Sequence, residues 1–257
     1  MTDGLREDWL WRIGSFAILS AAWEIVGRFS NPLLFPPLSK VISAWCEIIL
    51  SGELVNALAL SISALLLGLF FALVIGISIG IVMGWFRQLE NVIDMVFTLV
   101  LVIPMVGLIP MLIIAFGLGL KVRIVAIFLF AVPIIAFNSY TGTRQVDGNL
   151  VEMARAFGAA NWDLLRKIVL PAAIPGIMAG VRLGIGRAVV GMVTAELLIV
   201  SVGVGLIIMQ YTGTLETAKL YATVVTVIVI GVVVSYFGQW LDRSISERHG
   251  RRGAFEV

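Results

Sequence analysis

Residues 54–86 read LVNALALSISALLLGLFFALVIGISIGIVMGWF and contain no charged side chain. A helix rises about 1.5 Å per residue and the hydrocarbon core of a bilayer is roughly 30 Å thick, so about 20 apolar residues are enough to cross it. Further charge-free runs cover residues 95–120, 124–143, 197–215 and 220–241. Lipid cannot satisfy exposed backbone groups, and these runs lack the alternation of a barrel strand. The sequence therefore predicts an all-α membrane protein.

The overall composition agrees with a membrane location. Hydrophobic residues make up 60% of the 257 residues and charged residues only 13%, against about 25% charged in an ordinary soluble domain. Cys46 is the single cysteine, and the single histidine, His249, lies in a charged tail. Neither a disulfide within the chain nor a cysteine-based metal site is therefore expected. The net charge of +2 is too small to indicate nucleic-acid binding.

We predict about six transmembrane helices. They lie at about Trp9–Phe29, Asn56–Trp85, Val92–Phe116, Val122–Tyr140, Ile174–Val200 and Leu220–Leu241. The first also has the length of a signal-peptide core, but its acidic start and the lack of a clean cleavage site favour a retained helix. Prolines break the chain after it, and Ser39 is expected to cap a surface helix that ends near Leu50.

Orientation follows from the basic residues, which accumulate in short cytoplasmic loops. With the N-terminus inside, the cytoplasmic side would carry Arg6, Arg12, Arg87, Arg144, Arg155, Arg166, Lys167, Arg243, Arg248, Arg251 and Arg252, and the outer side Arg28, Lys40, Lys121, Arg123 and Lys219. Both termini are therefore expected in the cytoplasm. We expect residues 1–257 to form one transmembrane domain, with an N-terminal helix at 9–29, a core bundle at 56–241, a loop at 147–171 and a cytoplasmic tail at 242–257.

The longest expected cytoplasmic connection, residues 141–173, mixes charged, polar and apolar residues and so differs from the mainly apolar stretches on either side. Asp147 and Asn149 are suited to cap a helix that begins near Leu150. Gly158 is predicted to interrupt that helix. A second short helix is predicted to start at an Asn161 cap and to end at Pro171.

This connection resembles the coupling loop of ABC-importer permeases. Glu152-Met153-Ala154 is followed by three residues, Gly158, nine residues and then Ile168-Val169-Leu170-Pro171. The family signature reads Glu-Ala-Ala, three residues, Gly, nine residues, Ile, one residue and Leu-Pro, so Met153 is the one departure. An ordinary amphipathic linker is the alternative interpretation.

The resemblance implies a type I ABC-importer permease fold with a cytoplasmic coupling-helix loop at 147–171, seated in a cleft of the ATP-binding subunit. The docking residues would be Glu152, Met153, Ala154, Phe157, Gly158, Trp162 and Leu165. The implied partners are two ATP-binding subunits, a second permease copy in a homodimer and an extracytoplasmic solute-binding protein, besides membrane lipid. The sequence contains no Gly-Lys pair and hence no phosphate-binding P-loop. The chain is thus not expected to be an enzyme or to bind a cofactor; ATP and Mg²⁺ would belong to the partner subunits.

Further matching segments extend the resemblance over nearly the whole chain. They are Phe35-Pro36-Pro37-Leu38-Ser39-Lys40, Gly80-Ile81-Val82-Met83-Gly84, Arg182-Leu183-Gly184 and Ala195-Glu196-Leu197. Among the permeases, the chain is most similar to the nitrate, sulfonate and taurine branch. This implies a multi-pass protein of the bacterial plasma (inner) membrane that imports a small anionic or polar organic solute or an oxyanion.

Polar or kinked positions within the spans are the candidates for a translocation path. They are Pro104, Gly107, Pro110, Arg182, Arg187, Met192 and Glu196. The two prolines are interpreted either as pathway residues or as a packing kink. A charged residue at the bilayer centre is costly, so Glu196 is expected to pair, with Arg182 or Arg187 as candidate partners, or to reach water at the outer interface.

Two other functional classes fit parts of the sequence. An ion-coupled secondary transporter would also suit six spans with an intramembrane Glu196, but no internal repeat is detectable. An intramembrane hydrolase would need a nucleophile beside a base, and His249 lies in the tail. The coupling-loop signature favours the importer subunit over both.

Overall fold

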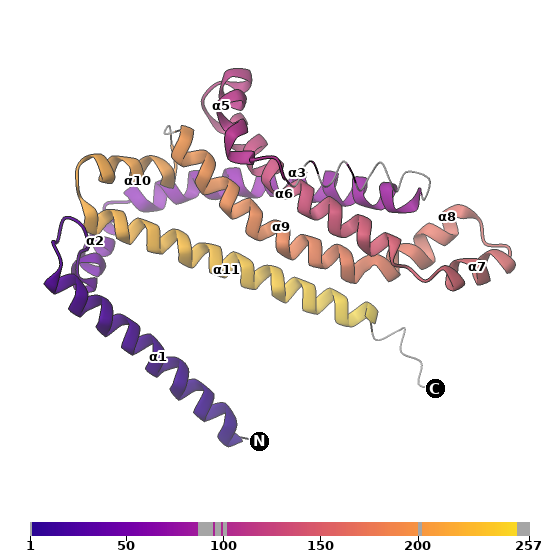
Figure 1. The fold of residues 1–257 in the computed structure, drawn as a ribbon, viewed down its shortest axis with the longest axis horizontal. Helices are drawn as coiled ribbons and strands as arrows, with labels where there is room; N and C mark the ends of the chain where they lie inside the picture. The colour runs from indigo at the N-terminus through magenta and orange to yellow at the C-terminus, as the bar shows by residue number, and fades with distance from the viewer. Residues whose placement is uncertain (1, 87–94, 96–98, 100–101, 200–201, 251–257) are drawn as a thin grey trace.

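The computed structural model describes residues 2–86, 95, 99, 102–199 and 202–250 (Figure 1). Over these residues the regular secondary structure is helical. The elements are α1 (Thr2–Phe29), α2 (Leu38–Leu50), α3 (Glu53–Trp85), α5 (Met105–Phe116), α6 (Leu120–Arg144), α7 (Gly148–Ala156), α8 (Asn161–Leu164), the π-helical turn η2 (Leu165–Val169), α9 (Leu170–Ile199), α10 (Val204–Gly213) and α11 (Thr217–Gly250). The predicted all-α architecture is confirmed.

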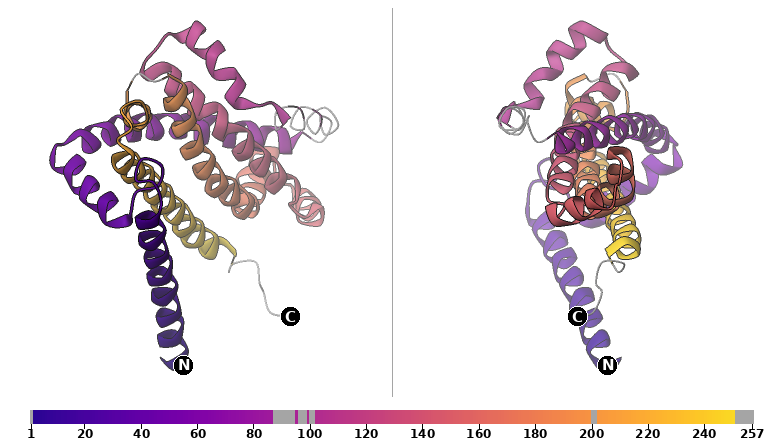
Figure 2. Two further views of the ribbon diagram at one scale, coloured as in Figure 1. Left: turned by 60° about the vertical axis from the view of Figure 1, so that its left-hand side comes forward. Right: turned by 90° about the vertical axis from the view of Figure 1, so that its right-hand side faces the viewer.

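Four helical stretches are long and apolar enough to cross a bilayer. They are Glu53–Trp85, Leu120–Arg144, Asn161–Ile199 and Thr217–Trp240. The helices run along the long axis of the molecule, with α2 at one end and α7 and α8 at the other (Figure 1). Helix α1 extends away from this bundle in every view (Figures 1 and 2). Two shorter apolar helices, α5 and α10, complete the described bundle.

Some of the predicted segments fall partly outside the residues that the structure describes. Most of the first part of the predicted Val92–Phe116 span falls outside them, as do Val200 and residues 251–257 of the predicted tail. In the described part of that span, α5 begins only at Met105, after Pro104. Helix α10 was not predicted, because Gly203, at a φ of 82°, divides a charge-free run that looked continuous.

The centre of the bundle is α6, which packs against α3 on one side and α9 on the other. Glycines on the neighbouring helices allow this close approach. A Cβ atom added to Gly80 of α3 would lie 2.5 Å from the carbonyl oxygen of Ala136 in α6, and one added to Gly176 of α9 would lie 2.5 Å from Cα of Gly142. Small residues permit such backbone contacts between membrane helices, where packing rather than water exclusion drives association.

A Gly80→Ala substitution is therefore expected to destabilise the bundle by about 1–3 kcal/mol, because the added methyl group meets backbone atoms. Gly186→Ala in α9 is the matched control, since a Cβ there meets nothing within 4 Å and alanine is the better helix former. Thermal unfolding of the detergent-purified protein checks both. Equal unfolding temperatures for the two variants would contradict this account of the α3–α6 contact.

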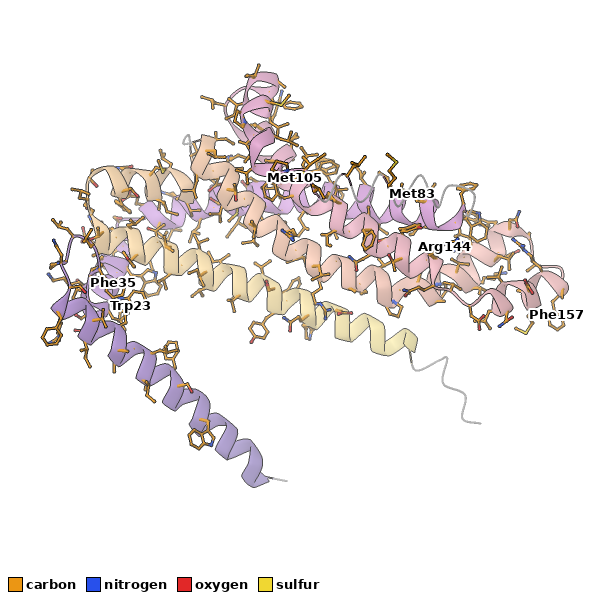
Figure 3. The ribbon with its side chains drawn as sticks, in the orientation of Figure 1. Trp23, Phe35, Met83, Met105, Arg144 and Phe157 are labelled. Carbon is orange, nitrogen blue, oxygen red and sulfur yellow. The ribbon has the colours of Figure 1, made fainter. Side chains whose placement is uncertain are left out.

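The end of the bundle that carries α2 is held by aromatic and ionic contacts. The rings of Trp23 and Phe35 lie 5.9 Å apart and both contact Tyr221 of α11 (Figure 3). The ammonium of Lys219 reaches Glu47 at 3.0 Å and Glu216 at 2.8 Å. The hydrogen bond from Lys219 also lowers the pKa of the Glu216 carboxyl below its ordinary value. These contacts join α1, α2 and α11.

The predicted Ser39 cap of α2 is wrong. Pro37 occupies the N-cap position and makes no side-chain capping bond. The backbone N–H and the hydroxyl of Ser39 instead donate to the carboxylate of Glu24, at 2.9 and 3.0 Å. A carboxylate from α1 thus satisfies the free donor that a local cap would otherwise take.

Candidate functional site

Helix α7 is a surface helix, as predicted for the first half of the connection. The carboxylate of Asp147 accepts a hydrogen bond of 2.9 Å from the backbone N–H of Asn149, which confirms the predicted N-cap. Helix α7 has no buried residue among those described. One face of it is therefore open to a partner.

Gly158 ends α7 in a left-handed turn. Its φ is 82°, its N–H donates to the carbonyl of Arg155 at 2.9 Å, and the N–H of Ala159 donates to that of Ala154 at 3.0 Å. This pair of bonds is the Schellman pattern, in which glycine avoids the steric cost of a side chain in left-handed backbone. The predicted interruption at Gly158 is confirmed, with a geometric cause inside the chain.

The second half of the connection differs from its prediction. Ala160, with extended backbone, occupies the N-cap of α8 in place of Asn161 and makes no side-chain capping bond. Pro171 does not end the helix, since Asn161–Ile199 continues as one helical stretch. Leu170 donates its N–H to the carbonyl of Leu165, a five-residue π spacing directly before the proline. The wider π turn accommodates the ring of Pro171, which would clash with the backbone of an ordinary α-helix.

The turn between α7 and α8 exposes large apolar side chains. Phe157 is 86% exposed, Trp162 68% and Met153 54%, and Phe157 lies at the extreme end of the molecule (Figure 3). Of the other predicted docking residues, Glu152 and Gly158 are exposed, whereas Ala154 and Leu165 are half-buried. We call residues 148–164 the α7–α8 tip. An exposed cluster of this kind typically marks a protein interface.

A hollow of about 480 Å³ separates the tip from the bundle. Glu152 and Arg155 line it from α7, and Thr143 and Arg144 line it from the end of α6. Because Glu152 borders this hollow and is exposed, its carboxylate is accessible at the same end of the molecule as the apolar cluster.

The residues predicted to line the translocation path do not lie together in the structure. Pro104, Gly107 and Pro110 are exposed on α5. Met192 is 2% exposed and belongs to the core between α3, α6 and α9. Arg182 forms an ion pair of 3.1 Å with Asp242 of α11.

Glu196 is fully buried and is paired with neither of its two predicted partners. One carboxylate oxygen accepts from Arg123 of α6 at 3.1 Å, and the other accepts from the Ser61 hydroxyl of α3 at 2.7 Å. Arg123 is 3% exposed and also donates to the carbonyl of Leu60. We call Ser61, Arg123 and Glu196 the polar node. Buried charges in a bilayer are tolerated when they are paired in this way.

The polar node also holds the start of α10. The N–H of Val204 donates to the Ser61 hydroxyl at 3.0 Å, and that of Gly205 to the Glu196 carboxylate at 3.2 Å. A Cβ on Gly203 would lie 2.5 Å from a Glu196 oxygen. The free donors at a helix start are thereby satisfied by side chains from α3 and α9.

Arg187 borders a second cavity, of about 320 Å³, between α5, α6 and α9. Its lining includes Met105 of α5, Phe130 of α6 and Thr194 of α9. Met105 lies where α5 meets the bundle (Figure 3). We call this cavity the α5–α9 pocket. Of the predicted path residues in the described part of the chain, Arg187 alone lines it.

Most of the chain matches a known protein family. Residues 72–247 match the family described as "Binding-protein-dependent transport system inner membrane component". The chain belongs to this family. The permease is therefore a multi-pass membrane protein, and both the α7–α8 tip and the polar node lie in its matched region, apart from Ser61.

Curated relatives support the assignment. The permease is 31% identical over 93% of its length to the "Putative aliphatic sulfonates transport permease protein SsuC" of Bacillus subtilis, of which it covers 88%. It is 27% identical over 93% of its length to the "Taurine transport system permease protein TauC" of Escherichia coli, of which it covers 89%. These relatives are permease subunits of transporters, and the present chain is likewise a transport subunit rather than an enzyme.

A solved structure shares the fold. An inward-facing structure of the MetNI methionine ABC transporter aligns with a TM-score of 0.62 at 21% identity, covering 75% of this permease and 95% of that chain. The expected importer-permease fold is confirmed.

Proposed function

We propose that this permease forms the membrane path for a small anionic or polar organic solute or an oxyanion, driven by two separate ATP-binding subunits, one of which docks on the α7–α8 tip. The observation that carries the proposal is the exposure of Met153 on α7, Phe157 at the turn and Trp162 on α8. Outside the bilayer such side chains are stabilised by burial against a protein. ATP and Mg²⁺ would be bound by the ATP-binding subunits.

The docking residues Glu152, Ala154, Gly158 and Leu165 support the same surface in different ways. Gly158 fixes the angle between α7 and α8. Ala154 and Leu165 are half-buried, and Glu152 provides an accessible negative charge. Closure of two ATP-binding subunits would then move the tip as a unit.

The direction of the chain supports a cytoplasmic tip. Helix α1 ends and α11 begins at the end of the bundle that carries α2, while α11 runs toward the tip (Figure 1). Arg144, Arg155, Arg166 and Lys167 lie at the tip end, as positive residues do on the cytoplasmic side. We infer that both termini are cytoplasmic, and that a solute-binding protein and a second permease copy complete the importer.

The solute class is inferred from the relatives that transport aliphatic sulfonates and taurine. An ion-coupled carrier is less well supported, because the Glu196 carboxylate, its best proton-carrying candidate, is bonded to Arg123, Ser61 and Gly205. Glu196 is better suited to positioning α10 than to contacting solute, and its predicted place in the path stays a prediction.

The test is co-purification of ATP-binding subunits with the tagged permease. Phe157→Asp and Trp162→Asp are each expected to reduce the recovered ATP-binding subunit at least tenfold, since each places a charge in an apolar contact. Leu50→Asp is the matched control, because Leu50 is 87% exposed at the opposite end, on α2. Loss of binding in all three variants, or in none, would contradict docking at the tip.

A further inference from the structure

Arg187 carries a charge within a spanning helix and has no bonded partner among the described residues. It lies near the middle of α9 with an exposed side chain, and within the described residues it makes no hydrogen bond or ion pair. Two other arginines within these helices are paired, Arg123 with Glu196 and Arg182 with Asp242. A charge at the centre of a membrane helix costs about 2.5–3.5 kcal/mol by insertion scales, so it normally faces water or a counter-ion.

The described side chains around Arg187 in this pocket are mainly apolar, and none of them is acidic. Arg187 is the single charged side chain among the described residues that line the α5–α9 pocket. Val190 and Thr194 follow it on the same face of α9, three and seven residues on, and line the same pocket. A guanidinium beside mainly apolar side chains from α5, α6 and α9 is suited to an anion with a small apolar body.

We propose that Arg187 is the anion-selecting residue of the translocation path, and that its guanidinium holds the oxyanion head group of a small organic anion, of the sulfonate type, as it passes the α5–α9 pocket. This rests on the proposed transport function. The planar guanidinium presents paired donors that match an oxyanion. A single charged contact in an apolar pocket is strong enough to favour entry and weak enough to allow release.

The proposal predicts a positive potential in a water-accessible pocket, which charged thiol reagents measure directly. The background is Cys46→Ser, which removes the single cysteine, and the reporter is Thr194→Cys, about 10 Å along α9 from Arg187. The permease in vesicles is reacted with anionic sulfonatoethyl methanethiosulfonate and cationic trimethylammonioethyl methanethiosulfonate. Arg187→Gln is expected to lower the ratio of the anionic to the cationic rate about tenfold, and Arg187→Lys to change it less than about threefold.

Two controls keep the result specific. Val190→Cys, on the same face and 51% exposed at the native side chain, is a second reporter in case Thr194→Cys misfolds. The native Cys46, exposed on α2, should react at the same rates with and without Arg187→Gln. An unchanged ratio at both reporters, or reporters that do not react at all, would overturn the proposal.

The outcome is separable from that of the proposed function. The thiol reaction requires neither nucleotide nor an ATP-binding subunit, whereas docking is measured by co-purification. If docking is normal and Arg187→Gln does not change the ratio of the two reaction rates at Thr194→Cys, only the proposed role of Arg187 is disproved. A charge effect without any docking would leave the anion path standing and remove the ATP-driven mechanism.

Discussion

Replacing Glu196 with alanine is expected to destabilise the permease by about 3–5 kcal/mol, because it leaves Arg123 as an uncompensated buried charge. The guanidinium is 3% exposed and donates to Glu196 at 3.1 Å. The substitution also removes the acceptor of the Ser61 hydroxyl and of the Gly205 N–H. The measurement is the temperature at which the detergent-purified protein loses its monodisperse chromatographic peak.

The physical cause is tested by removing both charges. A double variant, Arg123→Met with Glu196→Leu, should recover much of the lost stability, since no unpaired charge remains in the bundle. Asp163→Ala is the matched single control: its carboxylate also forms an ion pair, at 2.7 Å with Lys167, but at the surface, where such a pair contributes about 0–1 kcal/mol. A double variant no more stable than Glu196→Ala would show that charge pairing is not the cause.

Changing Gly158 to valine is expected to reduce ATPase activity of the assembled complex at least tenfold. No atom lies within 4 Å of a Cβ built on Gly158, so crowding within the chain is not the reason. The left-handed φ of 82° is the reason, because a side chain there costs about 1–2 kcal/mol, and relief of that strain would alter the angle between α7 and α8.

Asparagine separates backbone conformation from side-chain size. Gly158→Asn should retain most activity, since asparagine tolerates left-handed backbone. Gly158→Trp should fail through both strain and bulk at the docking surface. ATPase activity and co-purification of the ATP-binding subunits are read together for each variant. If valine behaves like asparagine, the left-handed turn is not what couples the tip to its partner.

The long helices could be predicted because the bilayer imposes a requirement on each segment separately. Each apolar run must bond its own backbone, so α3, α6 and α11 follow from charge-free stretches of local sequence. Helix α9 follows from a stretch that is mainly apolar although it holds Arg182, Arg187 and Glu196. The glycines at 76, 80 and 84 recur every four residues and indicate a close helix contact. Sequence alone does not say that the contact is with α6, because the identity of the neighbour depends on the whole bundle.

The polar node could not be predicted because its members are distant in sequence. Arg123 and Glu196 are 73 residues apart, and Ser61 and Glu196 135. Judged alone, Arg123 looked like a loop residue at the edge of a charge-free run. Burial of its charge becomes tolerable only once α6 and α9 are side by side, which is a property of the tertiary structure.

The expectation for Pro171 failed for a different reason. A proline normally ends a helix because its ring meets the carbonyl four residues earlier. The π turn at Leu165–Val169 changes that spacing, and a π turn has no dependable sequence pattern. The cap at Asp147 and the interruption at Gly158 could be predicted, because both act locally in the sequence.

The π turn also sets the rotational phase between the two ends of the stretch Asn161–Ile199. Each residue in a helix turns the chain by about 100°, and a π turn holds one residue more than the α-helical turn it replaces. The direction in which Trp162 points is therefore tied to the direction in which Arg187 points by that one extra residue. Removal of a single residue from 166–169 would therefore rotate the outward face of the tip about the helix axis relative to α9, although the sequence of the tip itself would be unchanged.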